Sequence, residues 1–142
     1  IGVHAVRRLA DEQIPDGVNV LDGGTGGFHL LECLCAHDSV VMIDATMDGQ
    51  PAGFVHVIEP HFASDFPRAL SAHDIGLRDL IESAVLLGPL PKIYLLTISI
   101  AEMQSLRTEL SPAVAESLPR ITQLVHSLLN SIAGVTTSRV IV

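Results

Sequence analysis

The sequence has 142 residues, of which 48% are apolar and 17% charged, so it is long and apolar enough for one globular domain with a sizeable core. Sixteen acidic residues against eight basic ones give a net charge of −8, which argues against nucleic acids and anionic membranes as partners, since both require basic patches. No apolar run reaches the roughly 18 residues that span a bilayer.

An amphipathic helix is predicted over the opening residues, from Ile1 through at least Ala10. Its apolar residues recur at helical spacing: Val3, Val6, Leu9 and Ala10. Because this periodicity is already present at Ile1 and no capping residue precedes it, we expect the helix to begin at or before the first residue.

Two strands follow, with a Gly-rich turn and a helix between them. Residues 18–21 predict a short strand, 22–27 a turn and 28–36 a helix. The only two cysteines, Cys33 and Cys35, would lie on different faces of that helix, so we expect no disulfide, which fits a cytoplasmic protein. Residues 39–43, rich in β-branched side chains and ending at Asp44, are typical of a strand buried on both faces.

The next strand is predicted at 53–58. Only the eight residues 45–52 separate it from the preceding strand, and a parallel crossover needs about a dozen, so we predict that the two strands pair as an antiparallel hairpin. Residues 59–70 contain two prolines and two phenylalanines without periodicity and predict a long surface loop. Such loops are often functional.

The second half of the chain is predicted to hold two helices around one strand. Ser71 and Asp74 form a capping-box pattern for a helix that ends at Gly88, and 93–99 predicts a strand. Ser111 precedes the last helix, in which Pro119 should cause a kink or a restart. The alternation predicts an α/β layered domain over residues 1–133, with 134–142 as a C-terminal tail.

The Gly-rich turn first suggests a nucleotide site, with Asp44 about twenty residues further on. A dinucleotide fingerprint beginning at Gly24 would require glycine at position 29, where the residue is His29. A Walker A motif requires a lysine, and none is near. Nucleotide binding is therefore disfavoured. The turn either borders a cleft or simply makes a tight strand-to-helix connection, and both interpretations stay open.

Two other residues are candidates for chemistry. Asp44 follows a buried strand, and sites in open α/β sheets form beyond the carboxyl ends of strands, although a turn or capping acid is an equal alternative. His73 falls in the first turn of the helix predicted after Ser71, where the helix dipole favours a neutral imidazole able to bind a metal, although a solvated histidine is the commoner case. The remaining histidines have no supporting context: His4, His29, His37, His56, His61 and His126.

Taken together, three segments resemble the hydrogenase maturation endopeptidases. They are, in order, Leu21-Asp22-Gly23-Gly24-Thr25, Ile43-Asp44-Ala45 and Ser71-Ala72-His73-Asp74-Ile75-Gly76-Leu77. Leu110-Ser111-Pro112 and the helix after it resemble the C-terminal end of the family, so the similarity runs over roughly residues 1 to 132.

The resemblance implies a fold and an activity. The fold is a three-layer α/β/α sandwich with a mostly parallel twisted sheet and one antiparallel strand. The activity is that of a hydrolase, a metal-dependent or aspartyl-type endopeptidase that removes the C-terminal extension of the nickel–iron hydrogenase large-subunit precursor. The enzyme would recognise nickel that the substrate already carries, and other divalent metals can substitute. The precursor would be the partner of a monomeric protein in the cytoplasm, with neither nucleic acid nor membrane involved.

The resemblance also implies site residues. The family's metal ligands are two carboxylates and a histidine, of which the second carboxylate falls on Asp44 and the histidine on His73, both acting in catalysis through the metal. Gly23, Gly24 and Thr25 would contact the substrate. We expect Asp44 and His73 to approach each other at one end of the sheet, with the turn 23–27 at the rim.

The sequence departs from the family at its start. The family begins with a strand, a Gly-x-Gly-Asn turn and an acidic first ligand, which would stand about two residues before Ile1. The resemblance therefore implies an N-terminally incomplete domain whose first strand is absent. Since a missing strand leaves backbone groups without ladder partners, we expect a gap in the sheet or a neighbouring molecule that fills it.

Ordinary serine, cysteine and zincin protease chemistries are disfavoured, because the sequence has no Gly-x-Ser-x-Gly, no His-Glu-x-x-His and no convincing Cys–His pair. A metal in the site could polarise the scissile carbonyl or activate a water, and both roles stay open. An alternative function is that of a non-catalytic metal or precursor chaperone for hydrogenase assembly, which would keep Asp44 and His73 without cleaving.

Overall fold

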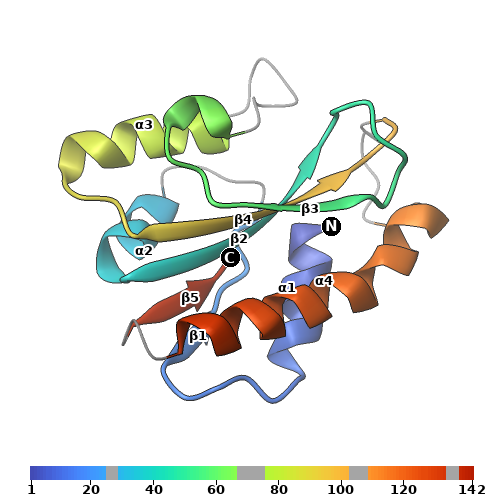
Figure 1. The fold of residues 1–142 in the computed structure, drawn as a ribbon, viewed down its shortest axis with the longest axis horizontal. Helices are drawn as coiled ribbons and strands as arrows, with labels where there is room; N and C mark the ends of the chain where they lie inside the picture. The colour runs from blue at the N-terminus through green and yellow to red at the C-terminus, as the bar shows by residue number, and fades with distance from the viewer. Residues whose placement is uncertain (25–28, 67–75, 103–108, 134–137) are drawn as a thin grey trace.

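A computed structural model of the chain describes residues 1–24, 29–66, 76–102, 109–133 and 138–142 (Figure 1). In these residues a five-stranded sheet forms the middle layer, with helices on both faces. The strands are β1 (Val18–Val20), β2 (Ser39–Thr46), β3 (Val55–Ile58), β4 (Lys92–Ser99) and β5 (Arg139–Ile141). The helices are α1 (Gly2–Ala10), α2 (Leu30–Ala36), α3 (Leu77–Leu87) and α4 (Pro112–Ile132), with a 3-10 turn, η1, at Ala63–Asp65. The predicted three-layer α/β/α fold is confirmed.

The strand order is β1-β5-β2-β4-β3, in which β3 alone runs antiparallel to its neighbour. The predicted mostly parallel sheet with one antiparallel strand is therefore confirmed. The predicted hairpin between 39–43 and 53–58 is wrong, because β4 lies between β2 and β3. The physical reason is burial: seven of the eight residues of β4 are buried, so it takes a central place with neighbours on both edges, and the more exposed β3 is left at the edge.

The end of the chain also differs from expectation. Of the predicted tail 134–142, residues 134–137 lie outside the described residues, whereas Arg139–Ile141 form β5, which lies between β1 and β2 and pairs with both. The expected gap or neighbouring molecule is therefore wrong for the described sheet, since the chain's own last strand joins β1 to the rest. Its side chains alternate between the two cores: Val140 packs under α2 and α3, and Ile141 under α1 and α4.

The predicted first helix is confirmed, although it begins at Gly2 and not at or before Ile1. It runs over Gly2–Ala10 with Ile1 at its N-cap, and it buries Ala5, Val6 and Leu9 against the sheet. This apolar face joins the core that α4 covers from the same side (Figure 1). Within the described residues, no helix is both long enough and apolar enough to cross a bilayer.

The later helices match the predictions in part. The structure begins α3 at Leu77, where the backbone N–H of Gly76 donates to the Asp79 carboxylate at 3.1 Å. The predicted start at Ser71 lies outside the described residues, and the predicted end at Gly88 is confirmed. Helix α4 begins after Ser111 as predicted, and it continues through Pro119 without a restart.

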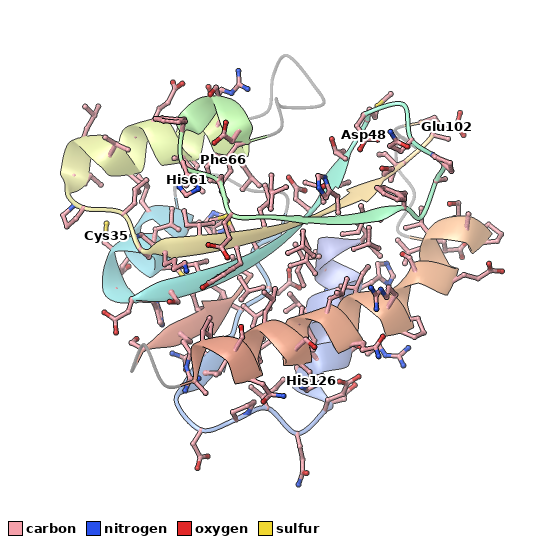
Figure 2. The ribbon with its side chains drawn as sticks, in the orientation of Figure 1. Cys35, Asp48, His61, Phe66, Glu102 and His126 are labelled. Carbon is pink, nitrogen blue, oxygen red and sulfur yellow. The ribbon has the colours of Figure 1, made fainter. Side chains whose placement is uncertain are left out.

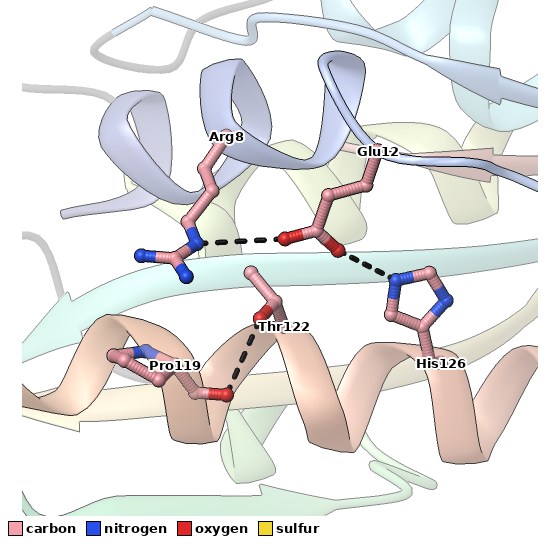
Figure 3. A network of polar contacts seen from close by, with 5 residues as sticks. All are labelled: Arg8, Glu12, Pro119, Thr122 and His126. Carbon is pink, nitrogen blue, oxygen red and sulfur yellow. Dashed lines mark hydrogen bonds and ion pairs between the residues drawn. The ribbon is translucent and has the colours of Figure 1, made fainter.

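A polar network joins α1 to α4 on the outer surface (Figure 3). The Glu12 carboxylate contacts His126 Nε2 at 2.7 Å and accepts a hydrogen bond from Arg8 Nε at 3.4 Å. The hydrogen bond with His126 is the largest of the influences that lower the pKa of Glu12; Arg8 lowers it further and partial burial opposes the change. The network therefore favours the ionised carboxylate.

Glu12→Gln should lower the free energy of unfolding at neutral pH by no more than about 1 kcal/mol. The side chains of His126 and Glu12 are 34% and 30% exposed, so solvent screens the interaction between them. Since folding lowers the pKa of Glu12 below its ordinary value of 4.5, this stabilisation is present above pH 4.5 and is lost as pH falls through the pKa of the folded state. Urea unfolding of the wild type and the variant, at neutral and at acid pH, measures the change. Glu82→Gln on the exposed side of α3 is the matched control, and a wild-type advantage that persists in acid would contradict the assignment.

Candidate functional site

Asp44 lies near the carboxyl end of β2, where the strand emerges from the core. The five preceding residues of the strand are buried, whereas Asp44 is half-buried. Val40 and Met42 belong to the core under α2 and α3, and side chains alternate along a strand, so Asp44 projects toward that same face. Its Oδ1 accepts a hydrogen bond of 2.8 Å from the N–H of Ala45.

The surroundings of Asp44 favour binding a cation. Burial, the largest influence, raises the pKa of Asp44, while the hydrogen bond from Ala45 lowers it to a smaller extent. A carboxylate that has lost part of its hydration is stabilised when a positive charge approaches. The group is thus suited to hold a metal ion.

The first turn of α1 lies against the same end of β2. A side chain at Gly2 would collide with the backbone carbonyl of Ile43, so the close approach of helix to strand depends on glycine. Figure 1 shows the start of α1 beside the central strands, toward the carboxyl ends of β2 and β4. This edge of the sheet therefore gathers Asp44, the start of α1 and the turns that follow the strands.

The turn after β1 reaches this edge from another strand. The Asp22 carboxylate accepts a hydrogen bond of 3.0 Å from the N–H of Gly24, and Gly24 has φ +62°, where glycine is favoured. Gly23 packs closely on Val142, since a Cβ there would lie 2.8 Å from the Val142 side chain. The end of β5 thus lies between Gly23 and Asp44. In the described residues, Gly23 and Gly24 form a tight turn. Thr25 lies outside the described residues.

His73 also lies outside the described residues, so its predicted approach to Asp44 stays a prediction. The direction of α3 bears on it. Helix α3 packs on the face to which Asp44 projects and is followed by a short connection to the start of β4, so it runs antiparallel to β4. Its N-terminal end is therefore the end nearer the carboxyl edge. Within the described ranges, no group of three His, Cys, Asp or Glu side chains is placed to hold a metal.

Two residues that the sequence did not single out lie in line with Asp44. The strand register aligns Asp44 with Thr97 of β4, and Thr97 with His56 of β3. In the sequence His56 has no supporting context, because its alignment with Asp44 depends on β4 lying between β2 and β3. No local spacing could have revealed it.

A cavity of about 300 Å³ lies at the opposite end of the sheet, beside the start of β4. Its lining includes His61, Phe66, Val85 and Lys92 (Figure 2). The Lys92 ammonium pairs with the Glu59 carboxylate at 3.3 Å, and both residues line the cavity. Because Lys92 and Asp44 belong to opposite ends of the paired strands β4 and β2, this cavity is not part of the site around Asp44.

Comparisons with known proteins cover nearly the whole chain. The family model HycI, described as hydrogenase maturation protease, matches residues 3–128. The hydrogenase 2 maturation protease of Escherichia coli K12 is 30% identical over 135 residues, which is 92% of this chain and 82% of that protein. The hydrogenase expression/formation protein HupD of Bradyrhizobium diazoefficiens is 32% identical, with 97% of this chain and 73% of the relative covered. HupM of Azotobacter chroococcum is longer, and the chain spans 62% of it at 30% identity.

The solved structures agree on the fold. The hydrogenase maturating endopeptidase HybD from E. coli superposes with a TM-score of 0.79 at 26% identity, covering 91% of this chain and 82% of that chain. The maturation protease HycI from Thermococcus kodakarensis has a TM-score of 0.69 at 21% identity, covering 89% and 80%. At that lower identity the likeness concerns the fold alone.

Proposed function

Because this chain belongs to the hydrogenase maturation protease family, we propose that it removes the C-terminal extension from the large-subunit precursor of a nickel–iron hydrogenase. The family and the fold make it a maturation endopeptidase; the precursor and the position of the cut are the proposal. The observation that carries it is Asp44, a half-buried carboxylate with a raised pKa, at the carboxyl edge of the matched fold.

Nickel enters this proposal with the substrate. We propose that nickel already held by the precursor docks on Asp44 and His73, which marks the precursor as ready for cleavage. Carboxylate and imidazole donors suit nickel, and other divalent ions of similar preference could substitute. The direction of α3, whose N-terminal end is the one nearer the edge that carries Asp44, supports this pairing.

Within this proposal each group has a defined task. Asp44 and His73 hold the ion, which could polarise the scissile carbonyl or lower the pKa of a water molecule. Gly23, Gly24 and Thr25 would border the extended peptide, where the absence of side chains on the two glycines lets the backbone approach. The N–H of Ala45 fixes one oxygen of Asp44, which leaves the other free to face the ion.

The test is incubation of the purified protein with nickel-loaded and with nickel-free precursor, followed by mass spectrometry of the large subunit. We expect the nickel-loaded precursor alone to lose a C-terminal segment. A protein that binds the nickel-loaded precursor and leaves its mass unchanged would instead be a non-catalytic chaperone.

His73→Ala should reduce cleavage of the nickel-loaded precursor by at least about 100-fold, since even a residue that only supports a metal ligand typically costs 10- to 100-fold. The melting temperature should change little. His61→Ala, at the opposite end of the sheet, is the matched control and should cleave at the wild-type rate. If His73→Ala retained activity but lost thermal stability, the residue would be structural.

A further inference from the structure

Three polar side chains form a row across the sheet at its carboxyl edge. Asp44 of β2 pairs in register with Thr97 of β4, and Thr97 pairs with His56 of β3. Residues directly opposite each other on paired strands project to the same face. That face is the one covered further back by α2 and α3, because Met42 and Leu95, two residues earlier on β2 and β4, belong to that core.

The row spans two strand spacings, with a solvent-accessible side chain at each end. Neighbouring strands lie about 4.8 Å apart, so the backbones at Asp44 and His56 are about 10 Å apart. Thr97 is 6% exposed and forms a floor between them. Asp44 is half-buried and His56 is exposed, so both flanking side chains have access to solvent. Two solvent-accessible polar groups at this spacing can both contact one peptide segment that crosses this edge of the sheet.

The connection between β2 and β3 adds apolar surface next to this row. Met47 is 53% exposed and Phe54 is 48% exposed. The N–H of Ser99 donates to the carbonyl of Phe54 at 2.9 Å, and Ser99 is also the register partner of Thr46, so this connection lies two residues beyond Thr97. Surfaces that bind extended peptides typically combine polar groups, which hydrogen-bond the main chain of the peptide, with exposed apolar side chains, which contact its side chains.

The same connection also carries a carboxylate, Asp48. The hydrogen bond from the N–H of Gln50 is the largest of the influences that lower the pKa of Asp48, and electrostatic attraction to His56 contributes in the same direction. Asp48 lies toward the tip of the connection, well away from His61 and Phe66 at the opposite cavity (Figure 2). The connection that leads into β3 therefore carries a negative charge as well as exposed apolar side chains.

We propose that His56 is a substrate-contacting residue, which hydrogen-bonds the main chain of the precursor's C-terminal segment on the side of the scissile bond away from Asp44. Phe54 contacts an apolar side chain of the same segment. This inference rests on the proposed function, and it assigns to His56 a role in holding the peptide rather than the metal.

The test compares His56→Ala with the wild type in cleavage of nickel-loaded precursor. Loss of one hydrogen bond should raise KM about 5- to 10-fold, with kcat within about 2-fold and an unchanged melting temperature. His56→Gln keeps a hydrogen-bonding group and should recover much of the loss. His61→Ala, an exposed histidine at the other end of the sheet, should match the wild type.

A wild-type KM in His56→Ala would overturn the inference, and so would an equal loss of kcat and melting temperature without rescue by His56→Gln. The proposed function fails separately, if the wild type binds the precursor without shortening it. In that case the Kd of the wild type and of His56→Ala for nickel-loaded precursor decides the inference, with a 5- to 10-fold weaker Kd expected. If the wild type neither cleaves nor binds the precursor, both the function and the inference are wrong.

Discussion

Asp44→Asn is expected to lower the rate of precursor cleavage by at least about 100-fold, because the amide is a poor metal ligand and cannot supply the negative charge that attracts the ion. The substitution preserves the shape of the side chain, and its carbonyl oxygen can still accept the hydrogen bond from Ala45. The loss of activity should therefore occur in a correctly folded protein. Mass spectrometry of the processed subunit over time measures it.

The same substitution should raise thermal stability at neutral pH. Burial raises the pKa of Asp44 above 3.8, so folding binds the proton more tightly and the ionised form costs free energy in the folded state. This penalty is absent below the pKa that Asp44 has in the unfolded state, and it is fully present once pH has risen through the higher pKa of the folded state. Asp44→Asn removes it, so its advantage in melting temperature should shrink as pH falls toward 3.8.

Asp11→Asn, at an exposed position after α1, is the matched control and should change neither activity nor stability. Loss of activity together with loss of stability in Asp44→Asn would indicate a structural carboxylate. Full activity in a stable variant would remove Asp44 from the site, and with it the observation on which the proposed function stands.

Ile141→Ala is expected to lower the free energy of unfolding by about 2–5 kcal/mol, the usual cost of truncating a large core side chain. Ile141 is 0% exposed and packs in the core under α1 and α4. A loss of this size is a large part of the 5–15 kcal/mol that typically stabilises a domain. Among the described strands, β5 is also the partner through which β1 joins the sheet, so the cavity weakens a junction as well as a core.

Urea unfolding followed by circular dichroism measures this loss. Leu86→Ala is the matched control, since Leu86 is 86% exposed on α3 and the same kind of truncation there should change the free energy of unfolding by less than about 0.5 kcal/mol. Equal effects of the two variants would mean that β5 is not an integral part of the sheet.

The order of the strands sets the distance between Asp44 and His56. A direct hairpin between the strands at 39–43 and 53–58 would have placed His56 on the strand next to Asp44. With β4 between them, the row widens by one strand spacing of about 4.8 Å, and Thr97 becomes its floor. His56 and Asp44 are therefore two strands apart, at a spacing at which both could contact one extended segment.

The sequence by itself was sufficient for the features that depend on neighbouring residues. Apolar spacing predicted α1, the pair Ser111 and Pro112 predicted the start of α4, and a β-branched run predicted β2, with Asp44 near its end. The ordered short motifs were enough to identify the family, and the comparisons with known proteins confirm it. These signals are local, because capping, periodicity and turn formation act within a few residues of one segment.

Only the tertiary structure decided which strands became neighbours. The place of β5 inside the sheet, the position of β4 between β2 and β3, and the alignment of His56 with Asp44 each depend on strands that lie far apart in the chain. A strand's partner is chosen by competition among all strands for burial and ladder hydrogen bonds, so a three-residue strand such as β5 becomes central when its two faces complete two cores. His56 acquired a chemical context for the same reason: the sheet placed it across β4 from Asp44.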